Sequence, residues 1–246
     1  MNQGEVIKQF TTPLDAPAFT MGPYLFHNRE YMNILYRKDL DALRKFVPEP
    51  LKIEDSLVRF EIMKMPDVTG LGSYTECGQA IPVSFGGEEG EYLHAMYVDS
   101  FAAISSGREI SAYPKKLGKP NLFVDSDTLV GTLDYGSLRV ATATMGYKHF
   151  PLDLSEARKE ICKPNFMIKK MPGYDGHPRI CELVRSQITD ITIHGAWSGP
   201  ARIEFFSHAL APMSDLPVLE VISASHIITD LTLSSPTVLH DYLTSY

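Results

Sequence analysis

The sequence predicts a mainly β protein whose sheet curls into a barrel or a sandwich. Segments with strand-like alternation of apolar and polar residues recur along most of the chain, and only two short segments carry helix signals. Many short strands with few helices are typical of these two architectures. A barrel also encloses a dry cavity, which would suit a reactive side chain.

The N-terminal segment 1–22 is punctuated by prolines and is expected to be extended and irregular. Residues 39–47 predict a short helix with Asp39 as its N-cap, an apolar stripe and a proline directly after it. A second helix is predicted over 153–162, because Asp153 begins a sequence that resembles a capping box and a proline follows.

Most other segments predict strands. The clearest is 57–64, where Val58, Phe60 and Ile62 alternate with Arg59, Glu61 and Met63. The glycine-rich, acidic segment 86–90 is typical of a hairpin loop. The further strands are expected at 80–85, 92–99, 122–125, 129–133, 138–145, 188–194, 202–206 and 218–223.

The composition indicates one soluble globular domain covering residues 1–246, with 44% hydrophobic and 22% charged residues. A net charge of −7 without a basic block argues against a nucleic-acid partner or an anionic membrane. No apolar stretch approaches the ~20 residues of a membrane span, and no secretory signal is visible. Three cysteines without metal-site spacing favour reduced thiols and a cytoplasmic location.

The common catalytic motifs are absent from the sequence. It contains no phosphate-binding loop, no dinucleotide fingerprint, no H-E-x-x-H and no nucleophile elbow. Glu91 and His94 have the spacing of a di-iron ligand pair on a helix, but their segment is strand-like, where residues three apart face opposite sides. No metal site is therefore expected.

Two adjacent lysines, Lys115 and Lys116, lie in the segment 111–118 between aromatic, proline and aliphatic neighbours. A lysine attacks a ketone only as the free amine, which is scarce near neutral pH because an ordinary lysine has a pKa of ~10.4. Burial and a second cation both favour the free amine. A pair of lysines can also be a solvated turn, and the similar pair at 169–170 shows that the dipeptide alone means little.

Burial of Lys115 is expected to favour its free amine more than the neighbouring charge of Lys116 does. A like charge ~7 Å away contributes about 2.4 kcal/mol at an effective dielectric constant of ~20, which is less than full burial can supply. Successive residues of an extended segment also point to opposite faces, so Lys115 would share a face with Tyr113 while Lys116 points away.

Several stretches are similar to the acetoacetate decarboxylase family, and the similarity runs from about residue 5 to residue 243. The most specific stretch is 111–118. The others are 22–24, 26–31, 58–61, 74–83, 107–109, 125–133 and 143–148. This resemblance implies a closed, largely antiparallel β-barrel with a few short peripheral helices and a buried active-site cavity. It also implies a large homo-oligomer, a dodecamer.

The resemblance implies cofactor-independent decarboxylation of acetoacetate to acetone and CO2 through a Schiff base on Lys115, with Lys116 beside it. Glu76 is then expected to handle protons at the imine or to polarise the site, and Arg29 to orient the substrate carboxylate. Glu61 would hold Arg29 or shape the local field. Tyr113 is placed with the substrate-binding residues.

Two other functions stay open at this point. The same lysine could carry aldol or dehydration chemistry on another keto acid, or the barrel could bind a small ligand without catalysis. Cys77, beside Glu76, could have a role in the site or be a small packed thiol.

Overall fold

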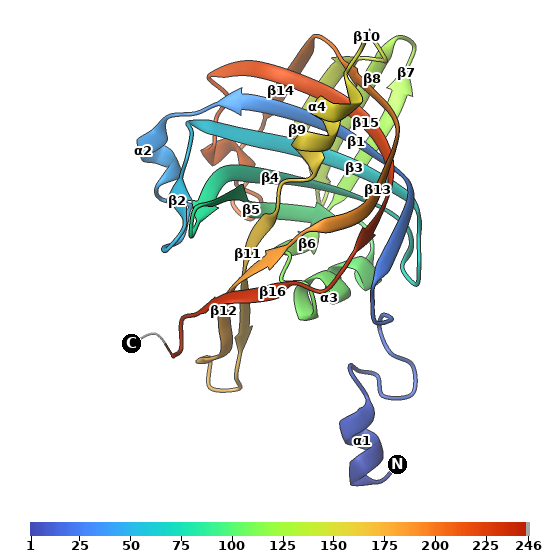
Figure 1. Cartoon of the computed structure of the whole chain (residues 1–246), viewed down its shortest axis with the longest axis vertical. Helices are drawn as coiled ribbons and strands as arrows, with labels where there is room; N and C mark the ends of the chain where they lie inside the picture. The colour runs from blue at the N-terminus through green and yellow to red at the C-terminus, as the bar shows by residue number, and fades with distance from the viewer. Residues whose placement is uncertain (245–246) are drawn as a thin grey trace.

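A computed structural model describes residues 1–244 of the chain (Figure 1). The described part forms a twelve-stranded and a four-stranded sheet with a few short helices. The helices are α1 (Gln3–Lys8), α2 (Leu40–Leu43), α3 (Phe101–Glu109), α4 (Leu154–Ile161) and a 3-10 turn at Met213–Asp215. None of the described helices is both long and apolar enough to cross a membrane.

The larger sheet is antiparallel except where β5 meets its neighbours β6 and β11. Its strands, in spatial order, are β10 (Phe150–Pro151), β13 (Ile188–Ser198), β15 (Glu220–Leu233), β1 (Tyr24–Arg37), β3 (Leu57–Val68), β4 (Gly72–Phe85), β5 (Glu88–Val98), β11 (Asn165–Pro172), β12 (Pro178–Ser186) and β16 (Thr237–Asp241), with β2 (Lys52–Ile53) paired to β4 and β6 (Lys115–Leu117) paired to β5. The smaller sheet runs β14 (Ala201–Phe205), β9 (Leu138–Gly146), β8 (Thr128–Tyr135), β7 (Lys119–Asp125).

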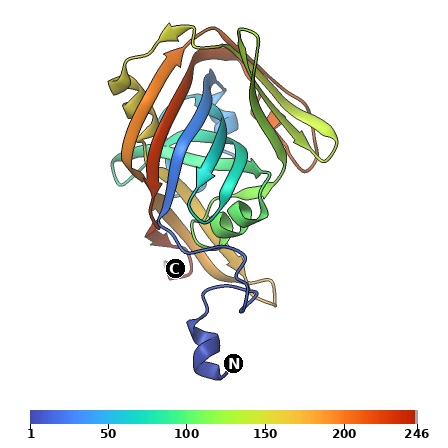
Figure 2. The same ribbon diagram turned by 90° about the vertical axis from the view of Figure 1, so that its right-hand side faces the viewer.

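The prediction of a closed barrel is wrong. Among residues 1–244 neither sheet closes on itself, because the larger sheet ends at β10 on one side and β16 on the other, and these strands do not pair. The larger sheet curves strongly, and the smaller sheet lies across part of one of its faces (Figure 2). Alternation in a sequence shows which residues face a core. It does not show whether the first and last strands pair, which is what closure requires.

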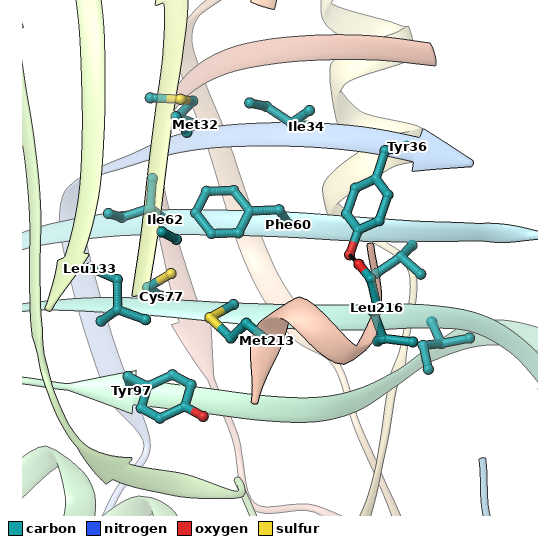
Figure 3. Close-up of a cluster of buried hydrophobic side chains, with 14 of the residues drawn as sticks. Met32, Ile34, Tyr36, Phe60, Ile62, Cys77, Tyr97, Leu133, Met213 and Leu216 are labelled. Carbon is teal, nitrogen blue, oxygen red and sulfur yellow. Dashed lines mark hydrogen bonds between the residues drawn. The ribbon is translucent and has the colours of Figure 1, made fainter. Parts of the chain in front are cut away.

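The main core lies between the two sheets (Figure 3). The alternation predicted for β3 is confirmed, since Val58, Phe60 and Ile62 are fully buried in this core. They pack with residues of the smaller sheet such as Leu133. The Tyr36 hydroxyl, at the edge of this core, donates a hydrogen bond of 3.1 Å to the Leu216 carbonyl oxygen. Burial of this apolar face is the main force that holds the two sheets together.

The opposite face of β1, β3, β4 and β5 carries a second core, with α3 and α4 packed nearby. Here Arg59, Glu61 and Met63 point away from Val58, Phe60 and Ile62, so this face carries two charged residues beside an apolar one. Both faces of these strands are therefore covered, one by the smaller sheet and one by the curving larger sheet. Several polar residues of this face, among them Arg59, Glu76 and Lys115, are buried and contribute to the site described below.

The local predictions were partly right. Asp39 caps α2 as predicted, but the helix ends at Leu43. Asp153 caps α4 as predicted, accepting hydrogen bonds from the next backbone amides. Every predicted strand overlaps an observed strand, but 92–99, 202–206 and 218–223 each extend one or two residues beyond it, and 86–87 form the tight turn between β4 and β5. The segment 1–22, expected to be irregular, contains α1, which projects away from the body (Figures 1 and 2).

Candidate active site

The site is built on a row of residues that crosses five neighbouring strands. The strand registers place Asn33, Glu61, Gly78, Met96 and Lys115 side by side on β1, β3, β4, β5 and β6. The middle position must be glycine, because a Cβ there would lie 2.7 Å from the Ala95 carbonyl oxygen. The row therefore carries a carboxylate and an amine, with Gly78 and Met96 between them.

A cavity of about 60 Å³ lies over this row and extends along the strands. This volume exceeds what a single water molecule needs, so the cavity can admit a small molecule. The residues that line it come from both halves of the chain: Phe26, Arg29, Tyr31, Asn33, Arg59, Glu61, Tyr74, Glu76, Glu91, Leu93, Met96, Tyr113, Lys115, Glu160, Ile161, Lys163, Asn165, Ile188 and Leu233.

Lys115 projects into this cavity and is only 6% exposed. Its backbone is held close to α3, because Arg108 donates a hydrogen bond of 3.2 Å to the Lys115 carbonyl oxygen. The Nζ atom lies 5.4 Å from the ring centroid of Tyr74 and 5.3 Å from that of Tyr113. Aromatic rings replace water around the amine, as the expectation of a buried lysine required.

Glu76 connects the amine to an arginine. Its carboxylate, 4% exposed, lies 3.0 Å from the Nζ of Lys115 and 3.5 Å from the Nη2 of Arg29. The Oε2 atom, which faces the amine, accepts no well-aligned hydrogen bond from the described residues. A carboxylate oxygen in this position can exchange a proton with the nitrogen or with an adduct formed on it.

Arg29 reaches the cavity because β1 is irregular beside it. The register of β1 with β15 shifts between Phe26 and Arg29, and Asn28 in between has a positive φ of 52°. Such a bulge changes the direction in which the following side chain points. The guanidinium lies over the rings of Phe26 and Tyr31, at 5.1 and 4.7 Å from their centroids, and its Nε has no hydrogen-bond partner among the described residues.

The surroundings of Glu61 allow its carboxyl to gain and lose a proton near neutral pH. Burial of the carboxylate raises the pKa of Glu61 from 4.5 to about 7, and the neighbouring charge of Glu91 acts in the same direction. The cations Arg59 and Arg29 oppose this shift without cancelling it. Near neutral pH this carboxyl is therefore present in both its acid and its ionised form.

The raised pKa of Glu61 should make the free energy of unfolding depend on pH. Between pH 4.5 and 7 the folded protein holds this proton while the unfolded chain releases it, so the free energy of unfolding falls as the pH rises through this window. Glu61→Gln should remove this part of the fall, and Glu89→Gln, on the exposed hairpin, should not. Urea unfolding at several pH values measures both, and identical slopes for the two variants would contradict the assignment.

The structure brings together five of the six residues predicted for the site and separates the sixth. Lys115, Glu76, Arg29, Glu61 and Tyr113 line the one cavity. Lys116 points to the other side of β6, where its ammonium contacts the Leu210 carbonyl oxygen and lies 5.2 Å from the ring centroid of Tyr135.

Three other residues considered in the sequence, Cys77, His94 and Glu91, have contacts that do not form a metal site or a reactive thiol. Cys77 is fully buried in the main core, and burial raises the pKa of its thiol, which makes it unreactive. His94 packs against the ring of Phe46, with centroids 4.8 Å apart, while Glu91 is ion-paired to Arg59. The described residues contain no group of three or more side chains arranged to hold a metal ion.

Sequence reasoning predicted Tyr113 but missed the rest of the aromatic wall and much of the polar lining. Tyr74 and Tyr31 border the amine and the arginine, and Asn33, Arg59 and Glu160 close the far end. The alternation of β3 placed Arg59 on the same face as Glu61, which was the one available signal. Glu160 lies on α4, far from β3 in sequence, and no local pattern could have related the two.

A buried amine 3.0 Å from a carboxylate, in a cavity that also contains an arginine, has the groups that an enzyme needs to act on a small keto acid through a lysine. The chain belongs to the acetoacetate decarboxylase (ADC) family, whose pattern matches residues 11–243.

Similar proteins cover nearly the whole chain. An acetoacetate decarboxylase of Clostridium botulinum is 70% identical over 244 residues, 99% of each chain. One of Clostridium acetobutylicum is 65% identical over 243 residues, 99% of this chain and all of its own. A solved structure of an acetoacetate decarboxylase superposes with a TM-score of 0.97 at 65% identity, over 99% of this chain and 100% of its own.

Proposed function

We propose that this protein decarboxylates acetoacetate to acetone and CO2, with Lys115 as the amine that forms the Schiff base. The observation that carries the proposal is the position of its Nζ, buried in the cavity and 3.0 Å from the Glu76 carboxylate. Membership of the family and 65–70% identity to proteins named acetoacetate decarboxylase support it. No metal or organic cofactor is part of this chemistry.

The steps follow from the electron demand of a β-keto acid. The free amine of Lys115 attacks the ketone carbon, and water leaves to form a protonated imine. The bond between the carboxylate and the neighbouring carbon then breaks, CO2 departs, and its electron pair moves into the imine to give an enamine. Protonation of the terminal carbon and hydrolysis release acetone and restore the amine.

The two carboxyl groups can divide the proton transfers. We assign Glu76 to the nitrogen, because its Oε2 faces the Nζ of Lys115. We assign Glu61 to the carbon, because a carboxyl with a pKa of about 7 can donate a proton to the enamine near neutral pH and regain one from solvent. Tyr113 and Tyr74 exclude water from the amine.

Arg29 is placed to orient the substrate carboxylate. Its Nε is buried without a partner, and its one recorded carboxylate contact within residues 1–244 is the 3.5 Å approach to Glu76. A strong grip on the carboxylate would oppose the reaction, because negative charge leaves this group in the transition state. The arginine therefore positions the substrate rather than binding it tightly.

Replacing Arg29 by glutamine should lower kcat/KM for acetoacetate about 10- to 100-fold, the scale of one or two hydrogen bonds to a charged group. Steady-state kinetics measure this loss. Arg185→Gln is the matched control, because Arg185 forms a 2.7 Å pair with Glu88 outside the cavity lining. Equal kinetics for both variants would remove Arg29 from the site.

The charge of Lys116 is expected to contribute little to keeping Lys115 as the free amine. Its ammonium contacts Leu210 and Tyr135 on the far side of β6, so its charge is partly exposed to solvent and screened. In the pH–rate profile of Lys116→Ala, the limb at low pH should shift by less than about two pH units, the limit set by the Coulomb estimate above. A larger shift would make the neighbouring charge the dominant cause.

Trapping with borohydride tests the proposed function directly. Acetoacetate and borohydride together should inactivate the enzyme irreversibly, and peptide mass mapping should find the reduced adduct on the peptide that contains Lys115. A non-catalytic binding protein would give no adduct. Aldol or dehydration chemistry on another keto acid would give an adduct without release of CO2, so a panel of keto acids scored for CO2 completes the test.

We infer further that the protein is cytoplasmic and forms a large homo-oligomer, a dodecamer on the pattern of the resemblance. Free cysteines at 77, 162 and 181 support a reducing compartment. The N-terminal arm supports association, because α1 projects from the body with exposed apolar residues such as Ile7, 74% exposed (Figure 2). Light scattering after size-exclusion chromatography measures the mass.

A further inference from the structure

We infer that Glu91 and Glu160 keep Arg59 paired so that this guanidinium offers no position for an anion in the cavity, and that Glu160 is thereby a specificity-determining residue against keto acids with a second carboxylate. This inference rests on the proposed function, and it extends that function to the choice of substrate.

Arg59 is a second guanidinium in the same cavity, and each of its three nitrogens contacts a carboxylate oxygen. Its Nε and Nη2 lie 2.9 and 2.7 Å from Oε1 of Glu91, and its Nη1 donates to Oε1 of Glu160 at 3.0 Å. The Glu160 oxygen is itself held in place by Asn33 at 2.9 Å and Ser225 at 2.7 Å. Two carboxylates thus neutralise one guanidinium, and the pairing leaves it no tendency to bind another anion.

The contrast with Arg29 identifies the end of the cavity where a carboxylate can bind. Arg29 shares one carboxylate, Glu76, with Lys115, and its Nε is buried and unpartnered among the described residues. A substrate carboxylate adds a favourable partner at Arg29. At Arg59 it would meet two carboxylates that already hold the guanidinium, and like charges there would repel it.

The two arginines lie at opposite ends of the polar strip. Along β3, Arg59, Glu61 and Met63 follow one another on one face, and Glu76 pairs with Met63 in the strand register. Same-face positions are about 6.6 Å apart, so Arg59 lies about 13 Å along the strand from the row of Glu76. A keto acid extended from Lys115 with a second carboxylate would therefore carry it toward Arg59.

The exposed fractions of these side chains indicate which partner of Arg59 is best replaced in an experiment, namely Glu160. The side chains of Arg59 and Glu91 are 8% and 7% exposed, whereas Glu160, on α4 at the rim, is 26% exposed. Loss of Glu160 removes the carboxylate partner of the Arg59 Nη1 and also of the Asn33 amide nitrogen, which donates to the same Glu160 oxygen. These groups together form a new position for an anion.

The experiment compares acetoacetate with 3-oxopentanedioate, a β-keto acid with a second carboxylate. Its decarboxylation consumes one proton and gives CO2 and acetoacetate, and NMR follows its disappearance after subtraction of the rate without enzyme. In Glu160→Ala, the ratio of kcat/KM for 3-oxopentanedioate to that for acetoacetate should rise at least about tenfold. Glu160→Gln should give a smaller rise, because its amide oxygen can still accept from Arg59.

The matched control is Glu88→Ala, which breaks an arginine–glutamate pair of the same length, 2.7 Å, outside the cavity lining. Its ratio should equal that of the unmodified enzyme. A general effect of removing one negative charge would raise kcat/KM for both substrates equally and leave the ratio unchanged. An unchanged ratio in both Glu160 variants overturns the inference.

Binding of unreactive acids separates this inference from the proposed function. Calorimetry should show that Glu160→Ala gains about tenfold in affinity for pentanedioate relative to butanoate. An enzyme that fails to decarboxylate acetoacetate but shows this gain would refute the proposed function and leave the pairing of Arg59 intact. An active enzyme without the gain would refute the pairing alone.

Discussion

Lys115→Ala is expected to lose at least roughly 10⁴-fold in kcat for acetoacetate, the scale on which removal of a covalent nucleophile acts. Among the described residues Lys163 is the other amine that lines the cavity, but its side chain is exposed at the rim, and Lys116 lies on the far side of β6. Release of CO2 measures the loss. Borohydride with acetoacetate should no longer form an adduct.

The variants Lys115→Ala and Lys115→Arg distinguish the role of Lys115 as a nucleophile from the role of its charge. Lys115→Arg keeps a cation near Glu76 but cannot form an imine at neutral pH, so it should be as inactive as the alanine variant. Lys170→Ala, from the other lysine pair on β11, is the matched control and should be fully active. Substantial CO2 release by either Lys115 variant would refute the Schiff-base mechanism.

The sequence predicted the surroundings of Lys115 better than the architecture of the sheets around it. Alternation in an extended segment placed Lys115 and Lys116 on opposite faces, and the structure confirms this separation. Burial of Lys115 was also expected and is observed. Both inferences depend on a local rule, namely that successive side chains of a strand point in opposite directions.

The predictions failed for elements that depend on more than the local sequence pattern. The long strand β1 was not predicted, because both of its faces are covered, a bulge at 26–29 interrupts its period, and charged and aromatic residues share one face. The helix α3 was missed for a similar reason, since it is short, rich in alanine and serine, and lacks a clear apolar stripe. Closure of the sheet and the pairing of Arg59 with Glu160 depend on contacts distant in sequence.

The remaining prediction concerns Gly107 of α3, which lies against the side chain of Lys115. A Cβ at this position would be 2.6 Å from Cδ and 3.0 Å from Cε of the lysine. The backbone there is also engaged, since Tyr113 donates a hydrogen bond of 2.9 Å to the Gly107 carbonyl oxygen. The helix surface under the lysine therefore has no room for even one methyl group, and we expect this contact to set the position of the amine.

Gly107→Ala should change stability and activity in opposite directions. Alanine is the better helix former by about 0.5–1 kcal/mol, and the flexible lysine side chain can move aside, so the free energy of unfolding should stay equal or rise. The displaced amine loses its alignment with Glu76, and kcat should fall on the order of 10²-fold, as displacements near 1 Å do. Urea unfolding and steady-state kinetics on one preparation measure the two changes.

The matched control is Gly4→Ala in α1, another helical glycine, where a Cβ would approach only Asn2 Oδ1, at 3.4 Å. This variant should show a similar gain in helix propensity and unchanged kcat. The rate of borohydride trapping gives an independent readout, because a misplaced amine should form the imine more slowly while KM changes less than kcat. Normal trapping and normal kcat in a folded Gly107→Ala enzyme would show that the contact does not position the amine. A parallel loss of stability and activity would instead mean that the methyl group disrupts α3 itself, since a positioning role alone leaves the fold intact.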